Sequence, residues 1–463
     1  MNNGVRGFDP QSDLQSFLDE NSIEVVKVGA PDIDGIWRGK RIMAKYFAES
    51  VAAAGTNICN ILFGWDLQDV SIPNMTYTGW HTGYPDVNLR PDLATLHVVP
   101  GEPGTAAVIC DILSTTTGEV VEISPRAALR RVIERAHNLG YEPICAYEFE
   151  FYLFKGSPRE LASAGWRDLE SITDGSHTYS VYRDSGTEHI IGEIRRRLAE
   201  VGVFIEASNS EHGPGQFEVN IHYGTALEAA DSALVLKHTV KEIAAKHGYT
   251  ASFMAKVNTG AAGSSGHVHQ SLVRRSDGAA VFANPEHPRE LSEVGQQYLA
   301  GVVAGTRDFT SLYLPTTNSY KRVEGGQWAG SSATWGVDNR TVAIRSIPAA
   351  GPAARIENRV PGADANPYLV LAACIASGLS GIERGLTPPP AVVGNAYELD
   401  SDGSLRLPNT LEKAIDVLSE SDLAKEYLGE EFVRHFTESR RWEVHQSQIT
   451  VTDFEIARYL EHI

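Results

Sequence analysis

The stretch ICAYEFEFYLF, residues 144–154, determines how the larger part of this chain folds. Apolar and polar residues alternate in it, which is typical of a β-strand because successive side chains point to opposite faces. Phe149, Phe151 and Leu153 share one face and are predicted to be core. Glu148 and Glu150 share the other face, where two like charges repel and strand propensity is low. Taken alone, such a pair is more often a solvent-exposed polar face.

Two further segments carry residues of the same kind. In EHGPGQFE (211–218), Glu211 and Glu218 flank a Gly-Pro-Gly turn, which lets the chain fold back so that both carboxylates approach one point. In GHVHQSL (266–272), His267 and His269 share one strand face, an arrangement often used to bind metal ions. Each feature alone is more often structural, but together they favour a common site.

A third group of residues is basic. Guanidinium groups bind carboxylate and phosphate oxygens in a bidentate way, and carboxylate ligands favour Mg²⁺ or Mn²⁺ over zinc. Metal-binding carboxylates beside clustered arginines therefore suggest phosphoryl transfer from a nucleotide. Neither a GxxxxGK[ST] loop nor a GxGxxG motif after a strand is present to explain the arginines otherwise. The arginines are Arg322, Arg340, Arg345, Arg355 and Arg359.

The segments around these motifs predict an α+β fold in two domains. Residues 1–112 are strand-rich and are expected to form a small N-terminal domain, with a helix over residues 44–55. Residues 113–463 alternate helices and strands and are expected to form a larger domain. Ser124–Pro125 marks a helix start, and residues 190–201 have helical periodicity. Further short strands are predicted at VFIEA (203–207), QFEVNIH (216–222) and ASFMAKV (251–257).

Charge and composition exclude several classes of protein. The chain has 463 residues, with 40 Lys and Arg against 59 Asp and Glu, a formal net charge of −19. Such a field repels nucleic acid and anionic lipid, so neither is an expected partner. The four cysteines form no CxxC pair, which fits a reducing cytoplasm. The longest apolar stretch, residues 369–382, is shorter than the roughly 18 residues of a membrane span and predicts a buried helix.

The ordered motifs resemble the glutamine synthetase family, class I type, over nearly the whole chain. The resemblance implies a β-grasp-like N-terminal domain and a catalytic α+β domain with a curved antiparallel sheet. It also implies a homo-oligomer, usually a dodecamer of two hexameric rings, with active sites between neighbouring subunits. The motifs are EFEF, EHGPGQFE, GSSGHVHQSL, NSYKR, DNRTVAIR and RIENRVPGADANPYL.

The same resemblance implies a role for individual residues. Two or more Mg²⁺ or Mn²⁺ ions would be bound at each site, and ATP would be a co-substrate that phosphorylates the γ-carboxylate of glutamate. An amine would then attack the γ-glutamyl phosphate. The first metal would be held by Glu150, Glu211 and Glu218, and the second by Glu148, His267 and Glu357. ATP would meet Glu206, Tyr223, His269, Ser271, Arg345 and Arg355, and glutamate with its phosphate would meet Gly263, Arg322, Arg340 and Arg359.

Departures from the family pattern indicate which amine the protein uses. Asp32, in PDIDG, resembles the N-terminal aspartate that helps bind ammonium and remove its proton, and is therefore counted with Arg340 and Arg359 as catalytic. The flap glutamate of ammonia-using members is replaced by Trp328, six positions after Arg322. An indole accepts no proton, but it packs well against the carbon chain of a larger amine. At Gly263 the backbone position is kept, while the asparagine that usually begins this loop is absent.

These departures resemble the branch that γ-glutamylates organic amines, such as γ-glutamylethanolamide and γ-glutamylpolyamine synthetases. A short monoamine such as ethanolamine is the expected substrate, with a polyamine as an alternative. An ordinary glutamine synthetase using ammonium is a further alternative, permitted by Asp32 and opposed by Trp328. A non-catalytic, glutamate-sensing relative is the last, opposed by the complete set of metal ligands. Tyr397 aligns roughly with a tyrosine adenylylated in some bacterial members, but GNAYELDSDG differs, and an ordinary loop tyrosine is expected there.

Overall fold

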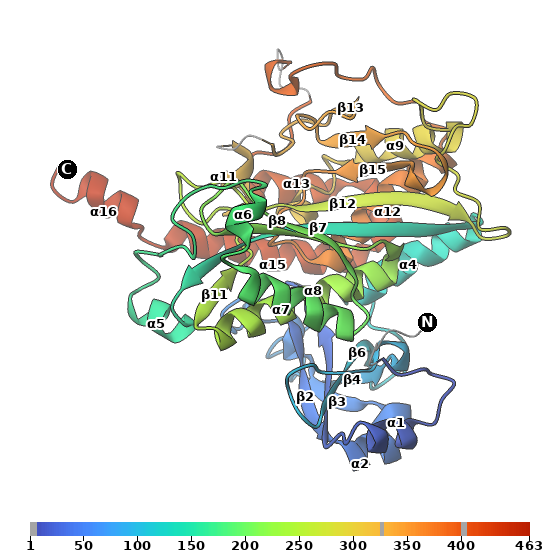
Figure 1. The fold of residues 1–463 in the computed structure, drawn as a ribbon, viewed down its shortest axis with the longest axis vertical. Coiled ribbons are helices and arrows are strands. Elements are labelled where there is room, and N and C mark those ends of the chain that lie inside the picture. Colours follow the sequence, from blue (N-terminus) through green and yellow to red (C-terminus); the bar gives the residue numbers. More distant parts are fainter. Residues whose placement is uncertain (1–6, 325–327, 400–404) are drawn as a thin grey trace.

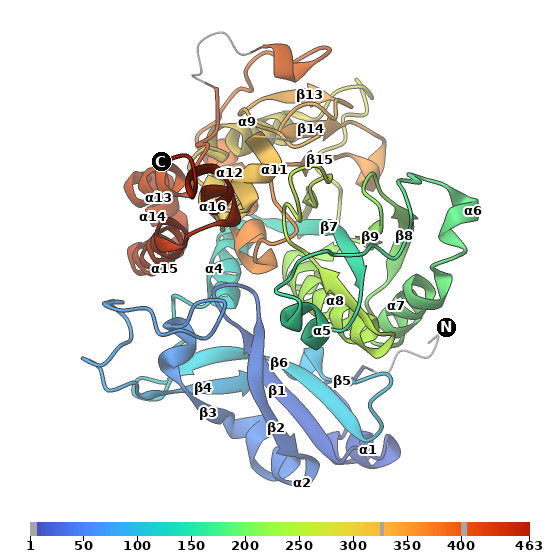
Figure 2. The same ribbon diagram turned by 90° about the vertical axis from the view of Figure 1, so that its left-hand side faces the viewer.

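The computed structural model describes residues 7–324, 328–399 and 405–463. These residues form two main β-sheets, each packed against its own hydrophobic core. Figure 1 shows the smaller, N-terminal sheet lying beside the larger sheet and its helices, and Figure 2 shows the same arrangement from the side. The predicted α+β fold class is confirmed.

The smaller sheet has the strand order β2-β1-β6-β4-β3, with β5 paired to β6. β1 and β6 are parallel, and the other pairs are antiparallel. The predicted boundary at residue 112 falls inside β6, and the division into two domains stays a prediction. The strands are β1 (Val25–Pro31), β2 (Trp37–Met43), β3 (Thr56–Cys59), β4 (Asp86–Pro91), β5 (His97–Val98) and β6 (Thr105–Ser114).

The larger sheet has the order β13-β14-β15-β12-β7-β9-β8, with β10 and β11 also paired to β7. All of its pairs are antiparallel except β13 with β14. The strands are β7 (Tyr141–Lys155), β8 (Ile205–Ser210), β9 (Gln216–Ile221), β10 (Gly224–Thr225), β11 (Tyr249–Ser252), β12 (Gly266–Arg274), β13 (Trp335–Val337), β14 (Ile344–Ile347) and β15 (Arg355–Asn358).

One predicted strand is shorter than expected. Of ASFMAKV (251–257), only the first two residues belong to β11. The chain then leaves the sheet because the main chain of Lys256 bonds the side chain of Asn318, with the Lys256 amide donating to Oδ1 and its carbonyl accepting from Nδ2, both at 2.9 Å. Phe253 instead packs against Phe151 beneath β7, at 5.4 Å between ring centroids.

The helices cover the face of β7 that carries Tyr147, Phe149 and Phe151, whereas Tyr152 and Phe154 pack in a separate small cluster. α8 and α4 contact β7 directly, and α12 packs against α9, α4 and α8. The predicted helix start is confirmed: Pro125 is the first residue of α4, although the hydroxyl of Ser124 does not cap it. The helices of this part are α4 (Pro125–Asn138), α5 (Pro158–Ser163), α6 (Val181–Asp184), α7 (Glu188–Glu200), α8 (Ala226–Lys246), α9 (Glu293–Gly305), α10 (Thr310–Tyr313), α11 (Ser319–Glu324), α12 (Pro367–Glu383), α13 (Leu411–Glu420), α14 (Asp422–Leu428), α15 (Glu430–Ile449) and α16 (Asp453–Tyr459).

Two helical predictions deserve separate mention. The predicted helix at residues 44–55 is present as α2 (Ala44–Tyr46), a π-helical turn at Phe47–Val51 and α3 (Ala52–Ala54), and Gly55 ends it with φ +76°. α1 (Leu14–Glu20) precedes the smaller sheet. The apolar stretch at 369–382 lies in α12 and is buried, as expected. In the described part of the chain, no helix combines the length and apolarity that crossing a bilayer requires.

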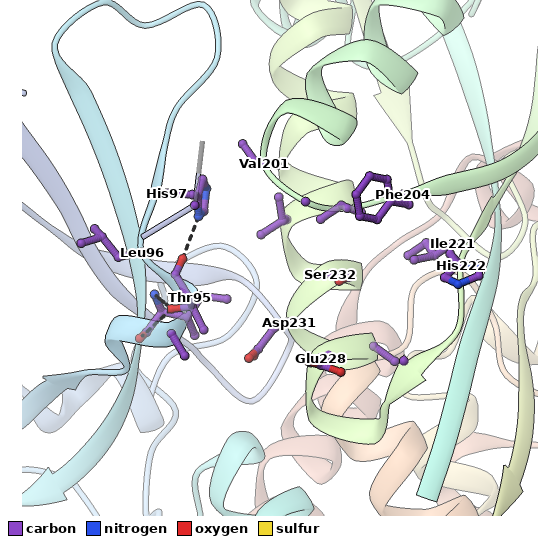
Figure 3. A pocket seen from close by; sticks show the side chains of 18 of the residues that line it. Thr95, Leu96, His97, Val201, Phe204, Ile221, His222, Glu228, Asp231 and Ser232 are labelled. Atoms are coloured by element: carbon purple, nitrogen blue, oxygen red, sulfur yellow. Dashed lines mark hydrogen bonds between the residues drawn. The ribbon is translucent and has the colours of Figure 1, made fainter. Parts of the chain in front are cut away.

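The smaller sheet, α8 and the segments 201–204 and 221–224 line an open cavity of about 330 Å³ where the two parts of the molecule meet. Figure 3 shows Thr95 and His97 on one wall, and Glu228 and Ser232 of α8 on the other. The His97 ring is tied to its own wall through Nδ1, 2.8 Å from the carbonyl oxygen of Thr95. None of the predicted metal ligands lines this cavity, although Tyr223 does.

Candidate functional site

The register of three strands gathers the charged residues of β7 with those of its neighbours. β12 places His267 opposite Glu148, and β9 places Glu218 opposite Glu150. Directly opposed residues of an antiparallel pair lie about 5 Å apart at Cβ, so the four side chains share one face of the sheet. The aromatic residues between them point to the other face and are buried, as the alternation predicts.

A second row of charged residues crosses β12, β15 and β14. Glu357 of β15 lies opposite both His269 and Arg345. Its side chain is 1% exposed, with Oε1 3.5 Å from His267 Nδ1 and Oε2 3.0 Å from Arg345 Nη1. Burial would raise the pKa of Glu357, but the guanidinium of Arg359, which forms an ion pair with it, outweighs burial together with the imidazoles of His267 and His269 and lowers the pKa to about 2. The carboxylate is therefore ionised and held in place.

His269 connects Arg355 with Glu148. Arg355 donates from Nε to His269 Nδ1 at 3.1 Å, so a neutral ring carries its proton on Nε2. That nitrogen lies 2.9 Å from Glu148 Oε1. Burial of Glu148 opposes ionisation, but the imidazoles of His267 and His269 prevail and hold its pKa well below its usual range. Ser271 follows on the same face of β12 and stands opposite Ile144.

For the carboxyl groups of Glu211 and Glu218, no neighbouring cation outweighs the effect of burial on the pKa. Burial, together with the charges of neighbouring glutamates, raises the pKa of Glu218 to about 9, and burial with the charge of Glu150 raises that of Glu211 to about 7. Glu150 itself accepts hydrogen bonds from the Ser265 amide at 2.8 Å and from Gln216 Nε2 at 3.2 Å. The site thus holds more negative charge than its own cations neutralise.

The geometry fits binding of divalent cations. Ligand atoms of Glu148, His267 and Glu357 lie within 4.8 Å of one another, and so do those of Glu150, Glu218 and His267. Nε2 of His267 is buried and has no hydrogen-bond partner in the described part of the chain. Carboxylate oxygens and one imidazole are suitable ligands for Mg²⁺ or Mn²⁺. Glu211, also predicted as a ligand, lies outside both groups.

The predicted glutamate-binding arginines differ in their surroundings. Arg322 is 4% exposed, and its guanidinium donates to the carbonyl oxygens of Val360 at 2.8 Å and Arg359 at 3.0 Å. Gly263 packs on its aliphatic part, since a Cβ there would lie 2.5 Å from Arg322 Cγ. Arg340 is exposed. Arg322 therefore shapes the loop as much as it offers donors.

Trp328 lies next to this arginine layer. Its carbonyl oxygen accepts a hydrogen bond from Arg359 Nη2 at 3.3 Å, and its amide donates to the hydroxyl of Tyr397 at 2.7 Å. Its indole is 55% exposed. Tyr397, for which an ordinary loop tyrosine is expected, lies in a short 3₁₀ turn, and its hydroxyl contacts the Trp328 main chain.

Asp32 lies in the turn between β1 and β2 and belongs to neither group of candidate metal ligands. Its Oδ1 accepts from the amides of Asp34 and Ile36, and its Oδ2 pairs with Arg38 at 2.6 Å. Burial, with the charge of Asp34, raises its pKa to about 6. Its carbonyl accepts from Asn366 at 3.0 Å. These contacts explain the turn between β1 and β2, and the catalytic role of Asp32 stays a prediction.

Two of the predicted ATP-binding residues, Glu206 and Tyr223, lie near each other at the β8 edge of the sheet. Glu206 Oε1 lies 2.6 Å from His222 Nδ1, and the His222 ring packs on Tyr223 with centroids 4.3 Å apart. Tyr223 is 54% exposed, so its ring is available to a ligand. His222 was not singled out in the sequence.

Two other residues near the carboxylates were not predicted from the sequence. Tyr179 lies near the carboxylates: burial and the charges of Glu211 and Glu218 raise its pKa. It stands in a stretch without periodicity, so no signal marks it. Gln216 bonds Glu150 and also donates to the carbonyl of Gly263 at 2.9 Å. Its place inside EHGPGQFE was the available signal.

The chain is similar to known proteins both in sequence and in structure. Glutamate–isopropylamine ligase of a Pseudomonas species is 48% identical over 97% of this chain and 98% of its own length. Type-1 glutamine synthetase 2 of Dictyostelium discoideum is 40% identical, over 95% and 84%. γ-Glutamylethanolamide synthetase GlnA4 of Streptomyces coelicolor is 36% identical, over 97% and 96%.

Among solved structures, a GmaS/ADP complex superimposes with a TM-score of 0.84 at 26% identity, covering 97% of this chain and all of the other. The family model for the catalytic domain of glutamine synthetase matches residues 122–459. Two of the relatives are named for organic amines, in line with the branch that the sequence resembles. The chain belongs to the glutamine synthetase family.

Proposed function

We propose that this protein is an ATP-dependent ligase that joins the γ-carboxylate of glutamate to a small organic primary amine through γ-glutamyl phosphate. Support comes from family membership, from relatives named for isopropylamine and ethanolamide, and from the carboxylate and arginine rows on one sheet face. The observation that carries the choice of amine is Trp328, held beside Arg359 where a proton-accepting glutamate is expected in ammonia-using members.

The roles of the site residues follow from their surroundings. Glu148, His267 and Glu357 would hold one divalent cation and Glu150 and Glu218 another, with Glu211 able to contribute. Such cations, when bound, offset the charge of the transferring phosphoryl group. Mg²⁺ and Mn²⁺ suit these ligands equally well.

The arginines and the ATP-side residues complete the arrangement. Arg359, fixed by Glu357, and the exposed Arg340 offer guanidinium donors to phosphate and glutamate oxygens, while Arg322 maintains the loop. His269 and Arg355, linked to each other, face ATP together with Ser271 and Arg345. Glu206 would contact ATP at the edge of the sheet, where the ring of Tyr223 would pack against adenine.

Amine selection would depend on Trp328. A neutral indole offers an apolar surface to an alkyl group and no carboxylate to an ammonium ion. Ethanolamine stays the specific prediction, and isopropylamine enters as a competitor because a relative 48% identical is named for it. Both are short monoamines, whereas putrescine and spermidine carry further charges that need anionic partners.

The test is release of phosphate from ATP with glutamate, Mg²⁺ and a series of amines: ammonium, isopropylamine, ethanolamine, putrescine and spermidine. A short monoamine is expected to give the highest kcat/KM, with little turnover of ammonium. Trp328→Glu should shift preference toward ammonium, and Trp328→Phe, which keeps an apolar ring, should not. Turnover of ammonium alone by the unaltered enzyme would establish an ordinary glutamine synthetase instead.

The protein would act in the cytoplasm, would form a homo-oligomer of two hexameric rings, and would have an N-terminal domain ending near residue 112. Mass measurement in solution tests the oligomeric state: a mass of about twelve chains of 50.3 kDa is expected, and a monomer would contradict it.

A further inference from the structure

The backbone of Trp328 adopts a conformation that it would not hold unaided. Its φ is +71°, in the left-handed region that side chains other than glycine rarely occupy. A bulky residue persists there only when its surroundings hold it. The orientation of the indole therefore depends on the groups that bind the Trp328 main chain.

Two side chains bind that main chain, one at each end of the residue. Arg359 donates to the carbonyl oxygen at 3.3 Å, and the amide donates to the Tyr397 hydroxyl at 2.7 Å. Arg359 is in turn paired with Glu357 and so belongs to the charged rows of the sheet. Tyr397 is the second side chain that binds the Trp328 main chain, and it lies 69 residues after Trp328 in the sequence.

Tyr397 is itself anchored to the segment that carries Arg340. The amide of Ala396 donates to Thr341 Oγ1 at 2.9 Å, and Asn339 Nδ2 donates to the Gly394 carbonyl at 2.9 Å. The side chain of Asn395 accepts from the Tyr397 amide at 3.1 Å and caps the short turn. Since Asn339 and Thr341 flank Arg340, the phenol is fixed relative to the site.

We propose that Tyr397 is a positioning residue for amine selection, whose hydroxyl holds Trp328 in the orientation in which its indole meets the amine. The inference rests on the proposed function. The same hydroxyl keeps its own proton available as a donor while accepting from Trp328. Tyr397 touches no reacting atom and acts through Trp328.

Kinetics of Tyr397→Phe test the inference. The variant keeps the ring and removes only the acceptor. The KM for the preferred amine should rise about 3- to 10-fold, which is the ratio that the loss of one hydrogen bond of ordinary strength gives. The ratio of kcat/KM for this amine to kcat/KM for ammonium should become smaller. The KM values for ATP and glutamate should stay within about twofold. Tyr46→Phe, at an exposed tyrosine of α2, is the matched control and should change nothing.

A double variant tests whether Tyr397 acts through Trp328. Trp328→Ala combined with Tyr397→Phe should be no worse than Trp328→Ala alone, because the second change then has nothing left to position. Additive losses would overturn the inference, and so would equal increases in all three KM values, which indicate a general structural role. Thr341→Val removes the hydrogen bond to the Ala396 amide but leaves the Tyr397 hydroxyl in place, and it should also raise the KM for the amine.

Fluorescence separates failure of this inference from failure of the proposed function. The chain has seven tryptophans, so the difference in emission between the wild type and Tyr397→Phe is measured again in a Trp328→Phe background. A difference that vanishes in that background supports the contact even if no organic amine is turned over. Turnover of an organic amine with neither a fluorescence nor a KM difference overturns the inference alone.

Discussion

Two buried groups of charged residues in this molecule contrast in their balance of charge. One surrounds Arg126 at the junction of α4, α8 and the smaller sheet, and the other is the glutamate-rich group on the face of β7. Both are largely shielded from water, where charge is costly unless it is paired. They meet that requirement in opposite ways.

The Arg126 group is complete within the chain. Arg126 is 2% exposed and bonds Asp92 at 2.8 Å, Asp111 at 2.6 Å and Asp231 at 2.9 Å. Arg130 adds bonds to Asp92 and Asp111. Burial would raise the pKa of Asp92, but Arg126 outweighs burial and lowers it. Every acid here has a cation of the protein beside it.

The glutamate group on β7 is incomplete within the chain. Glu218 has a raised pKa, and His267 has a buried nitrogen without a partner among the described residues. A protein that places like charges together against their repulsion commonly does so for function. The balanced group joins parts of the fold, whereas the charges of the unbalanced group are suited to a cation.

The largest expected effect is loss of activity on removing one charge from the unbalanced group. Glu218→Gln keeps the side-chain shape and should lower kcat/KM about 10³-fold or more, since a bound metal would lose a ligand. Stability without metal should change little at neutral pH, because the raised pKa already leaves the Glu218 carboxyl protonated there and glutamine replaces one neutral group with another. Phosphate release and urea unfolding measure the two effects, and retained activity would remove Glu218 from the metal site.

The opposite pattern is expected for the balanced group. Asp231→Ala leaves Arg126 without two of its hydrogen bonds and frees the hydroxyl of Tyr368. The free energy of unfolding should drop by about 3 kcal/mol, while kcat of the folded fraction changes little. Urea unfolding and kinetics on the same sample check this. If activity falls and stability does not, the contrast between the two groups is wrong.

Metal binding should stabilise the protein only through the unbalanced group. Mg²⁺ at about 100 times its Kd should add about 2.7 kcal/mol to the free energy of unfolding. Asp231→Ala should gain a similar amount, but Glu218→Gln should gain much less. Thermal unfolding with Mg²⁺ and with EDTA gives the comparison, and an equal gain in both variants would place the metal elsewhere.

A smaller effect is expected at a buried histidine whose ring nitrogens have no hydrogen-bond partner among the described residues. His435 of α15 packs edge-on against Phe63 and Tyr77, and burial, with the nearby Arg440, lowers its pKa to about 3. The unfolded chain then binds the proton more readily, so stability is lost as pH falls below the unfolded pKa of about 6.5.

At pH 5 this loss should amount to about 2 kcal/mol relative to neutral pH. His435→Phe should remove that part of the pH dependence, and the difference between the two unfolding curves measures it. Parallel curves for the wild type and the variant between pH 5 and 7.5 would show that His435 does not titrate as expected.

Local periodicity made part of the fold predictable. The alternation around Glu148 and Phe149 specifies β7 and which of its faces is core, because side-chain direction in a strand depends only on position. Pro125 likewise marks the start of α4 through its fixed φ. Wherever local preference and burial agree, the structure follows the sequence. β11 ends early because the Lys256 main chain meets Asn318, a contact that no local pattern announces.

The candidate site was predictable as a set of residues but not as an arrangement. Only the family resemblance predicts that Glu357 and His267 bind the same metal. The register of β12 and β15 brings the two side chains together. Glu211 was grouped with Glu150 and lies outside the closer groups. Tyr179 came from a stretch with no pattern at all.

Residue identity and near neighbours are enough to predict the strand and helix types, the family and the excess of negative charge. The pairing of Arg126 and the lack of pairing among the glutamates of β7 become visible only in the folded chain. The same holds for the contact between the Tyr397 hydroxyl and the Trp328 amide. Such contacts depend on strand register and on how distant segments pack, and neither is encoded in local periodicity.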